Sequence, residues 1–535
     1  MRPSTASTGV GLKRLLASAL LYAASSIAAD NGLVGSRVCE KCHAEIYRKY
    51  SRTAMAQTSG LALHADVPEQ SFSANGGYEY SISRGASGLS LQFRKPGVIS
   101  GSRELSYYAG SGATARSYLI SVDGFLYEAP ATYYTSSAKW APSPGYDSYN
   151  YPFLTRGIAP ACLQCHATGI REIAGTQNGF ESPPFVEPGI GCERCHGPGA
   201  AHAASAMRSD IVNPATLEPR RRDSVCAQCH LSGEIRVDRA GKSSMRFAPG
   251  ELLSDYAIAF VRQTRDAGIK VNSHVESLTR SACARGSGDR LWCGTCHDPH
   301  SVPAASEKVA WFRSRCQTCH TPAQCARGEN CIACHMPRTE AADADHVVYT
   351  DHSIPRRPIP RNRKPPADAP LTAFGGVRSG PRDLGLAYAI VALRESNPAY
   401  SARAFDLLRE AQRQSEEDPE TLAYLADLYV KRSDDASARA LYERLYALVR
   451  AAGAPESSAA AHLGAYQMEQ GHYDEAIRLF REALHISPAL VLVRMNLAVA
   501  LIKTGRPGEA RPVLAKALEF NPSFTAAREL LDQIR

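Results

Sequence analysis

The pattern Cys-x-x-Cys-His occurs seven times in the chain, and it limits the possible folds more than any other feature. Both thiols can bond to one porphyrin, and the histidine that follows lies close enough to bind the iron from one face. The pattern therefore predicts seven covalently attached c-type haems, numbered here by motif from 1 to 7. The expected attachment residues are Cys39, Cys42, Cys162, Cys165, Cys192, Cys195, Cys226, Cys229, Cys293, Cys296, Cys316, Cys319, Cys331 and Cys334, followed by the iron ligands His43, His166, His196, His230, His297, His320 and His335.

Structural zinc is the competing interpretation, because Cys-x-x-Cys pairs also build tetrahedral thiolate sites. Zinc gives no reason for a histidine directly after every second cysteine. Fourteen of the sixteen cysteines belong to the motifs, which leaves Cys283 and Cys325. This distribution argues against a disulfide framework, and the spacing of the two remaining cysteines does not decide whether they pair.

Residues 1–29 predict a secretory signal peptide. Three basic residues precede an apolar run at 15–27, and Ala28 and Ala29 offer a cleavage site. An uncleaved anchor is the alternative, but spanning a bilayer takes about 20 apolar residues. We therefore expect a periplasmic or otherwise exported protein with no membrane span after cleavage. The formal charge of +8 does not indicate a nucleic-acid partner, because the haems add negative charge.

The second axial position of each iron separates a carrier from an enzyme. A carrier closes both faces of the iron, whereas a catalytic haem leaves one face open. The candidate ligands are His202, His274, His300, His346, His352, His64 and Met55. His202 and His300 follow their own motifs too closely to reach around the porphyrin, so we expect them to serve neighbouring haems. Met55 lies about 18 Å along an unbroken helix from His43 and would also serve another iron; packing is the alternative for Met55 and His64.

Motif spacing and composition divide the mature chain into three parts. Residues 30–354 predict a haem-packed cytochrome domain, mainly helical and loop-rich, in which close porphyrins supply much of the buried apolar surface. A small antiparallel β insertion is expected at about 72–151, with Asp123-Gly124 as a tight hairpin turn. Its tyrosines are expected to pack a core, and no catalytic residue is assigned. Residues 355–371 are rich in proline and arginine and predict an extended linker.

Residues 372–535 predict an all-α solenoid, because small residues recur with a 34-residue period typical of tetratricopeptide repeats. The aligned small residues are Ala392, Ala426, Gly464 and Ala498, and then Ala404, Ala438, Ala476 and Ala510. The second unit departs from the pattern, with Leu445 at a small-residue position and about four extra residues. The concave face is expected to bind a protein partner; covering the cytochrome domain is the alternative.

Several segments resemble exported multihaem c-type cytochromes related to the tetrahaem cytochrome of ammonia oxidation, in versions with C-terminal tetratricopeptide repeats. They are Gly191–Gly199 with His202, Cys296–His300, and Cys334–Pro337 with His346 and His352. The resemblance implies electron transfer to and from redox partner proteins through mostly bis-histidine haems. Related nitrite reductases carry a Cys-x-x-Cys-Lys motif that this chain lacks, which weakens an enzymatic interpretation.

The sequence thus predicts a periplasmic electron-transfer protein with seven haems and a repeat domain for docking. Two alternatives stay open. One is a multihaem oxidoreductase that acts on a small nitrogen or sulfur compound at one open haem. The other is a repeat scaffold within a larger redox complex.

Overall fold

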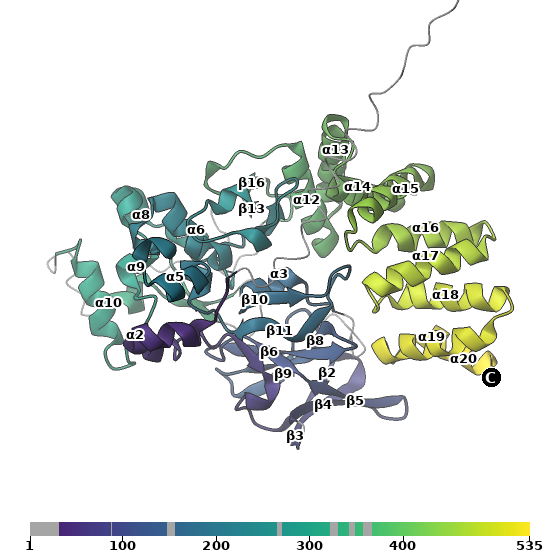
Figure 1. Ribbon diagram of the computed structural model, residues 1–535, viewed down its shortest axis with the longest axis horizontal. Helices are drawn as coiled ribbons and strands as arrows, with labels where there is room; N and C mark the ends of the chain where they lie inside the picture. The colour runs from purple at the N-terminus through teal and green to yellow at the C-terminus, as the bar shows by residue number, and fades with distance from the viewer. Residues whose placement is uncertain are drawn as a thin grey trace, which may run out of the picture.

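The computed structural model describes residues 32–86, 88–146, 156–264, 270–321, 330–341, 348–356 and 366–534. The predicted signal peptide, Cys325 and the candidate ligand His346 lie outside these ranges. In Figure 1 the strands of the first half of the chain lie mostly in the lower middle of the molecule, most of the short helices lie to the left, and the helical repeats are stacked along the right side.

The β part contains two antiparallel sheets whose strands alternate buried and exposed side chains. In β3 (Tyr78–Gly85) and β4 (Gly88–Lys95), buried Tyr80 and Ile82 pair with buried Phe93 and Leu91. The four-stranded sheet runs β2–β3–β4–β5 and the five-stranded sheet runs β1–β6–β7–β8–β9. The other strands are β1 Ser59–Leu61, β2 Gln70–Ala74, β5 Ile99–Leu105, β6 Tyr107–Ala109, β7 Ala115–Val122, β8 Phe125–Tyr134 and β9 Lys139–Pro142.

The hairpin turn predicted at Asp123-Gly124 is present. Both residues have positive φ angles, 53° and 83°, as a two-residue turn between right-twisted strands requires. The β part begins at Ser59 rather than at about residue 72, because the three-residue strand β1 is too short to show an alternating pattern.

Short helices carry the motifs. They are α2 Ser36–Tyr50, α3 Pro160–Gln164, α4 Glu193–His196, α6 Pro219–His230, α9 Cys293–Cys296, α10 Lys308–Gln317 and α11 Cys331–His335. Between them lie two small sheets, β10 (Ala167–Glu172) with β11 (Phe180–Pro188), and β14 (Arg338–Glu340) with β15 (Val348–Thr350). The prediction of a mainly helical domain therefore understated the amount of β structure. These strands are short and lie between closely spaced motifs.

Helical hairpins form the repeat part, and the predicted small residues lie where the helices cross. Ala404, Ala438, Ala476 and Ala510 are fully buried. The helices are α12 Pro381–Glu395, α13 Pro398–Gln414, α14 Pro419–Lys431, α15 Asp435–Ala452, α16 Ser458–Glu469, α17 Tyr473–Ile486, α18 Val491–Lys503, α19 Pro507–Phe520 and α20 Thr525–Gln533. The extra residues of the second unit lengthen α15 to 18 residues, and Gly453 ends it with a φ of 63°.

The two ends of the solenoid both contact the rest of the chain. Helix α12 packs against the sheet β12–β13–β16 (Ile235–Asp238, Ala257–Arg262, Leu371–Ala373), so that Phe260 and Leu386 share one apolar core. At the far end the ring of Phe520 lies 5.5 Å from that of Tyr127. The solenoid therefore contacts the preceding part of the chain near both of its ends, and also through Gln177, which bonds to Ser457 and Ile486. Among the residues described, no helix has the length and apolar character needed to cross a membrane.

Candidate haem-binding sites

Four motif histidines each face a histidine from another part of the chain. The ring centroids lie 6.3 Å apart for His43 and His202, 5.9 Å for His196 and His300, 6.2 Å for His297 and His352, and 5.0 Å for His230 and His274. The first two pairs have nearly parallel rings, at 18° and 10°.

These separations fit the geometry of one metal ion held between two imidazoles. A bound imidazole nitrogen lies about 2 Å from a metal, and the ring centroid lies about 1 Å further away. Two imidazoles on opposite sides of one iron therefore have centroids about 6 Å apart. Three of the four pairs match this separation closely. The His230–His274 pair is about 1 Å shorter and its rings are nearly perpendicular, at 85°. The ring of His274 also lies 4.9 Å from that of His352, so these two pairs adjoin.

Backbone carbonyls contact the Nδ1 atom of three of these histidines, which favours the tautomer that binds metal. The Nδ1 atoms of His196, His202 and His352 lie 2.7, 2.9 and 2.9 Å from the carbonyl oxygens of Val212, Met207 and Thr350. An Nδ1–H that donates to a carbonyl leaves the Nε2 lone pair for a metal. The donor set thus fits haem iron in both chemistry and orientation.

Two further motif histidines are anchored in the same way. His166 Nδ1 contacts the hydroxyl of Thr58 at 2.9 Å, and His335 Nδ1 contacts the carbonyl of Pro355 at 3.0 Å.

Burial lowers the pKa of His166. Burial, reinforced by the neighbouring histidines, lowers the pKa of His274 to about 3. His166 and His274 are therefore neutral near pH 7, which is the form that binds iron.

Local turns carry His202 and His300 away from their own motifs. Gly197 has a φ of 82° and turns the chain after His196, so that helix α5 (Ala200–Ser205) presents His202 to motif 1. The Asp298 side chain accepts a 2.9 Å bond from the backbone N–H of His300 and stabilises the turn after motif 5. Each of these histidines faces a different motif from the one that it follows.

Cysteines of different motifs also lie side by side. Cys39 interacts with Cys192, Cys165 with Cys229, and Cys226 with Cys293. Interaction with Cys39 lowers the pKa of Cys192 to about 7, and interaction with Cys229 lowers the pKa of Cys165 to about 6. The attachment edges of motifs 1 and 3, 2 and 4, and 4 and 5 therefore adjoin.

The remaining candidates are placed less centrally. The Met55 carbonyl accepts a bond from the backbone N–H of Ile190, just before motif 3. Met55 therefore lies beside motif 3, although it follows motif 1 in the sequence. His64 lies exposed in the 3₁₀ helix η2 (Ala62–His64), which packs on strands β4 and β6. The thiol of Cys283 lies near Cys296 and Cys316 of motifs 5 and 6.

Glu193 is a structural residue that the sequence did not reveal. It lies between the two cysteines of motif 3 and is only 4% exposed. Its carboxylate accepts backbone N–H bonds from Val34 at 3.0 Å, Gly35 at 2.8 Å and Gly199 at 2.7 Å. It thereby ties the segment before motif 1 to motif 3, although nothing in the Cys-x-x-Cys-His pattern sets it apart from other spacer residues.

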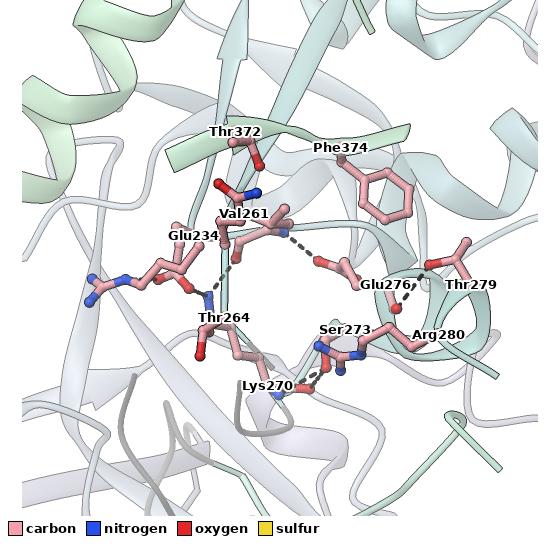
Figure 2. A pocket seen from close by; sticks show the side chains of 13 residues that line it. Glu234, Val261, Thr264, Lys270, Ser273, Glu276, Thr279, Arg280, Thr372 and Phe374 are labelled. Carbon is pink, nitrogen blue, oxygen red and sulfur yellow. Dashed lines mark hydrogen bonds and ion pairs between the residues drawn. The ribbon is translucent and has the colours of Figure 1, made fainter. Parts of the chain in front are cut away.

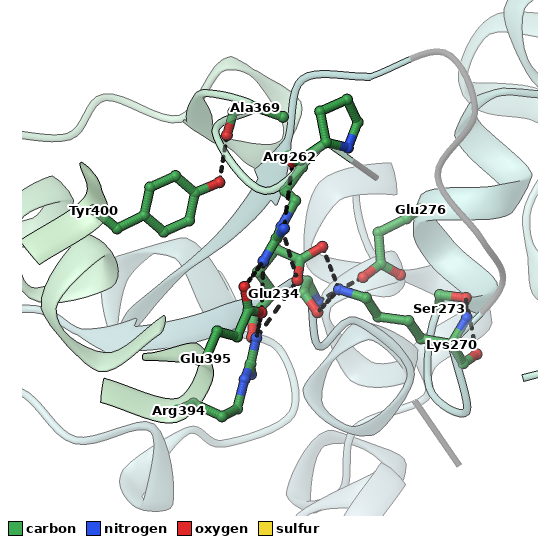
Figure 3. A network of polar contacts seen from close by, with 11 residues as sticks. Glu234, Arg262, Lys270, Ser273, Glu276, Ala369, Arg394, Glu395 and Tyr400 are labelled. Carbon is green, nitrogen blue, oxygen red and sulfur yellow. Dashed lines mark hydrogen bonds and ion pairs between the residues drawn. The ribbon is translucent and has the colours of Figure 1, made fainter. Parts of the chain in front are cut away.

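A cavity of about 550 Å³ lies between strand β13, strand β16 and helix α7 (His274–Thr279). Figure 2 shows Lys270, Glu276 and Glu234 at its wall. These charges continue into a network that reaches the repeat part, where Arg262 binds Glu395 of α12 at 2.5 Å and Glu234 at 3.4 Å (Figure 3).

Known protein families match segments in both halves of the chain. Residues 147–197, which include motifs 2 and 3, match the family "Cytochrome c554 and c-prime". Residues 467–534 match the tetratricopeptide repeat family. The multiheme cytochrome MtrA of Shewanella baltica is 25% identical over 214 residues, which cover 36% of this chain and 57% of that protein. The findings support a multihaem cytochrome with tetratricopeptide repeats.

The similar solved structures match only about a quarter of the length of this chain. A crystal structure of MamA is 14% identical and covers 27% of this chain and 81% of that one, with a TM-score of 0.24. Pseudomonas aeruginosa pilF is 20% identical and covers 29% of this chain and 67% of that one, with a TM-score of 0.25. The matched stretch of MtrA leaves more than two fifths of that relative uncovered.

Proposed function

We propose that this cytochrome is an exported electron-transfer protein that carries seven c-type haems. The observation that supports this function best is the set of opposed histidine rings, which join different motifs at the separation expected for one iron between two imidazoles. An iron with two strong axial ligands is closed to substrates and suits a carrier.

The proposed ligand pairs follow from those facing rings. His43 pairs with His202 on haem 1, His196 with His300 on haem 3, His230 with His274 on haem 4, and His297 with His352 on haem 5. His166, His320 and His335 hold haems 2, 6 and 7 from one face. Their second ligands are proposed to come from His346, Met55 and His64.

The haems, when bound, supply one-electron ferric and ferrous chemistry. The chain's residues supply attachment, orientation and proximity. The cysteines that adjoin across motifs, such as Cys226 and Cys293, would place neighbouring attachment edges together. Carbonyl-anchored imidazoles would keep the ligands from rotating when the iron changes its charge. Little rearrangement on electron transfer is the property that a carrier needs.

One experiment separates the carrier from an oxidoreductase with an open haem. The exported holoprotein is examined by electron paramagnetic resonance as isolated and by carbon monoxide binding after reduction. A carrier with seven closed irons shows only low-spin signals and binds no carbon monoxide. A high-spin signal together with carbon monoxide binding would instead support catalysis on a small nitrogen or sulfur compound at haem 2, 6 or 7.

The repeat part is proposed to dock a redox partner protein. Deleting residues 372–535 would be a poor test, since Leu371 and Phe260 share a core with α12. A surface substitution is cleaner: Leu492 on α18 is 68% exposed. Leu492→Asp should weaken capture of the partner from a periplasmic extract while leaving the haem spectrum unchanged. Partner capture that is unchanged in Leu492→Asp, and in variants of other exposed residues on the first helix of each repeat, would favour a covering or scaffold role for the repeat part.

Export is proposed from the leader sequence. N-terminal sequencing of the mature protein should begin at or near Asp30, after cleavage beside Ala28 or Ala29. A mature chain that keeps residues 1–27 would support the membrane anchor.

A further inference from the structure

The segment that follows motif 4 is bonded at two points to the segment that carries His274. His230 ends helix α6, and three residues later the backbone of Gly233 makes two bonds to one partner segment. Its N–H donates to Glu276 Oε1 at 2.6 Å, and its carbonyl accepts from Lys270 Nζ at 3.0 Å. Figure 3 shows Lys270 and Glu276 next to each other in this polar network.

Helix α7 is short, so these two bonds set its position. It begins at His274, and Glu276 lies within its first turn. Lys270 leads into the helix through Ser273, whose hydroxyl accepts from the Lys270 N–H at 2.9 Å. The rings of His230 and His274 lie 5.0 Å apart. The two bonds near them join Gly233, three residues after His230, to Lys270, four residues before His274, and to Glu276, two residues after it.

Neither ring has an anchor of its own. The Nδ1 atoms of His230 and His274 are buried and have no hydrogen-bond partner among the described residues, unlike those of His196, His202 and His352. For this pair the surrounding backbone must therefore supply the alignment that carbonyls supply elsewhere.

Gly233 is suited to aligning the backbone between these two histidines, and it is hard to replace. It has a φ of 62°, and a Cβ there would collide with the carbonyl of Phe260. Glu276 is 7% exposed, and its Oε2 has no hydrogen-bond partner in the described structure. A buried carboxylate with one unpaired oxygen is costly to stability, and its bond to the Gly233 N–H offsets part of that cost.

We propose that Glu276 and Lys270 are positioning residues that hold His274 against the iron of haem 4. The proposal rests on the ligand pairs given above. This clamp, formed by Glu276 and Lys270, also extends toward the repeats, since Lys270 binds Glu234 at 2.5 Å and Glu234 is paired with Arg262 and Arg394. The sixth ligand of one haem is thereby linked through four side chains to the first repeat helix.

The test compares full-length holoprotein variants of matched haem content by electron paramagnetic resonance and by carbon monoxide binding after reduction. Glu276→Ala removes the bond to Gly233, whereas Glu276→Gln keeps an acceptor oxygen of the same length. We expect Glu276→Ala to gain up to one high-spin, carbon monoxide-binding haem per chain. Glu276→Gln should retain the wild-type spectrum.

Two further variants calibrate this result. His274→Ala removes the proposed ligand and should open one haem fully. Asp427→Ala removes a partly buried carboxylate bond of the same length in the repeat part, from Tyr442 Oη at 2.6 Å, and should leave the spectrum unchanged.

A wild-type spectrum for Glu276→Ala, alongside an opened haem in His274→Ala, would overturn the clamp and leave the ligand pair intact. An unchanged spectrum in His274→Ala would instead overturn the ligand pair and the clamp together. If Glu276→Ala does not accumulate, Lys270→Met removes the other bond to Gly233. An opened haem in Lys270→Met supports the clamp, and a wild-type spectrum refutes it.

Discussion

The imidazole rings of His43 and His202 lie 6.3 Å apart and within 18° of parallel, although one belongs to motif 1 and the other follows motif 3. The contact joins helix α2 to helix α5. Glu193 strengthens the same junction by binding the backbone of Val34 and Gly35 from within motif 3. Motifs 1 and 3 are thus built as one unit from two distant stretches of chain.

Replacing His202 should open haem 1. In the His202→Ala holoprotein, one more haem per chain than in the wild type should become high-spin and bind carbon monoxide after reduction, because an alanine cannot ligate iron. His472→Ala is the control, since this exposed histidine lies in the repeats and contacts Gln467. Equal carbon monoxide binding in the His202→Ala and wild-type proteins would rule out this ligand.

Replacing Glu193 should destabilise the fold without removing a haem ligand. Glu193→Ala leaves three backbone N–H groups without their acceptor, which costs roughly 2–4 kcal/mol. Thermal unfolding followed by circular dichroism should show a lower midpoint for this variant. Glu193→Gln keeps an acceptor oxygen and should lose clearly less; an equal loss in both variants would mean that the charge, rather than the bonds, matters.

Glycine positions in the repeats offer a matched pair. A Cβ at Gly464 would lie 2.6 Å from the ring of Phe480, whereas a Cβ at Gly508 in α19 meets no atom within 4 Å. Gly464→Ala should lower the free energy of unfolding by about 1–2 kcal/mol, because overpacking outweighs the gain in helix propensity. Gly508→Ala should be neutral or slightly stabilising in the same denaturant titration, and a loss there as large as at Gly464 would contradict the packing account.

Acid should weaken the junction between the repeats and the haem-bearing part. Burial opposes ionisation of Glu395, but bonds to Arg262 and Arg394 outweigh it and lower its pKa below the ordinary 4.5. A lowered folded-state pKa means that the stabilisation is complete above about pH 4.5 and is lost as the pH falls through the folded value. Glu395→Gln should therefore be less stable than the wild type by about 2 kcal/mol at pH 7.

The same variant gives the pH control. The difference between Glu395→Gln and the wild type should shrink on acidification below pH 4.5, as measured by hydrogen exchange of α12. A difference that stays constant down to pH 3 would show that folding does not lower the pKa of Glu395.

Much of the fold follows from the sequence because local rules dominate there. The small residues Ala404, Ala438, Ala476 and Ala510 recur with the repeat period and are all fully buried. The Asp123-Gly124 turn follows from the ease with which these two residues adopt positive φ. The contact of Phe520 with Tyr127, in contrast, joins residues far apart in sequence, and no periodic pattern encodes it.

The candidate sites, like the fold, could be predicted from the sequence only where local spacing decides the outcome. Motif spacing predicts that His202 and His300 serve neighbouring haems, because the chain is too short to reach the far face of their own iron. Which neighbour each one faces depends on tertiary packing, so the pairs with His43 and His196 required the structure. Glu193 and Glu276 could not be found from the sequence, since their roles depend on backbone groups contributed by distant segments.

The mass of the intact mature protein, recorded under denaturing conditions, tests the central claim most directly. Thioether-bound haem survives unfolding, whereas zinc and non-covalent cofactors are lost. The account predicts one species whose mass is that of the chain beginning near Asp30 plus seven haems. The mass of the bare polypeptide, or of a chain with fewer than seven haems after full maturation, would contradict it.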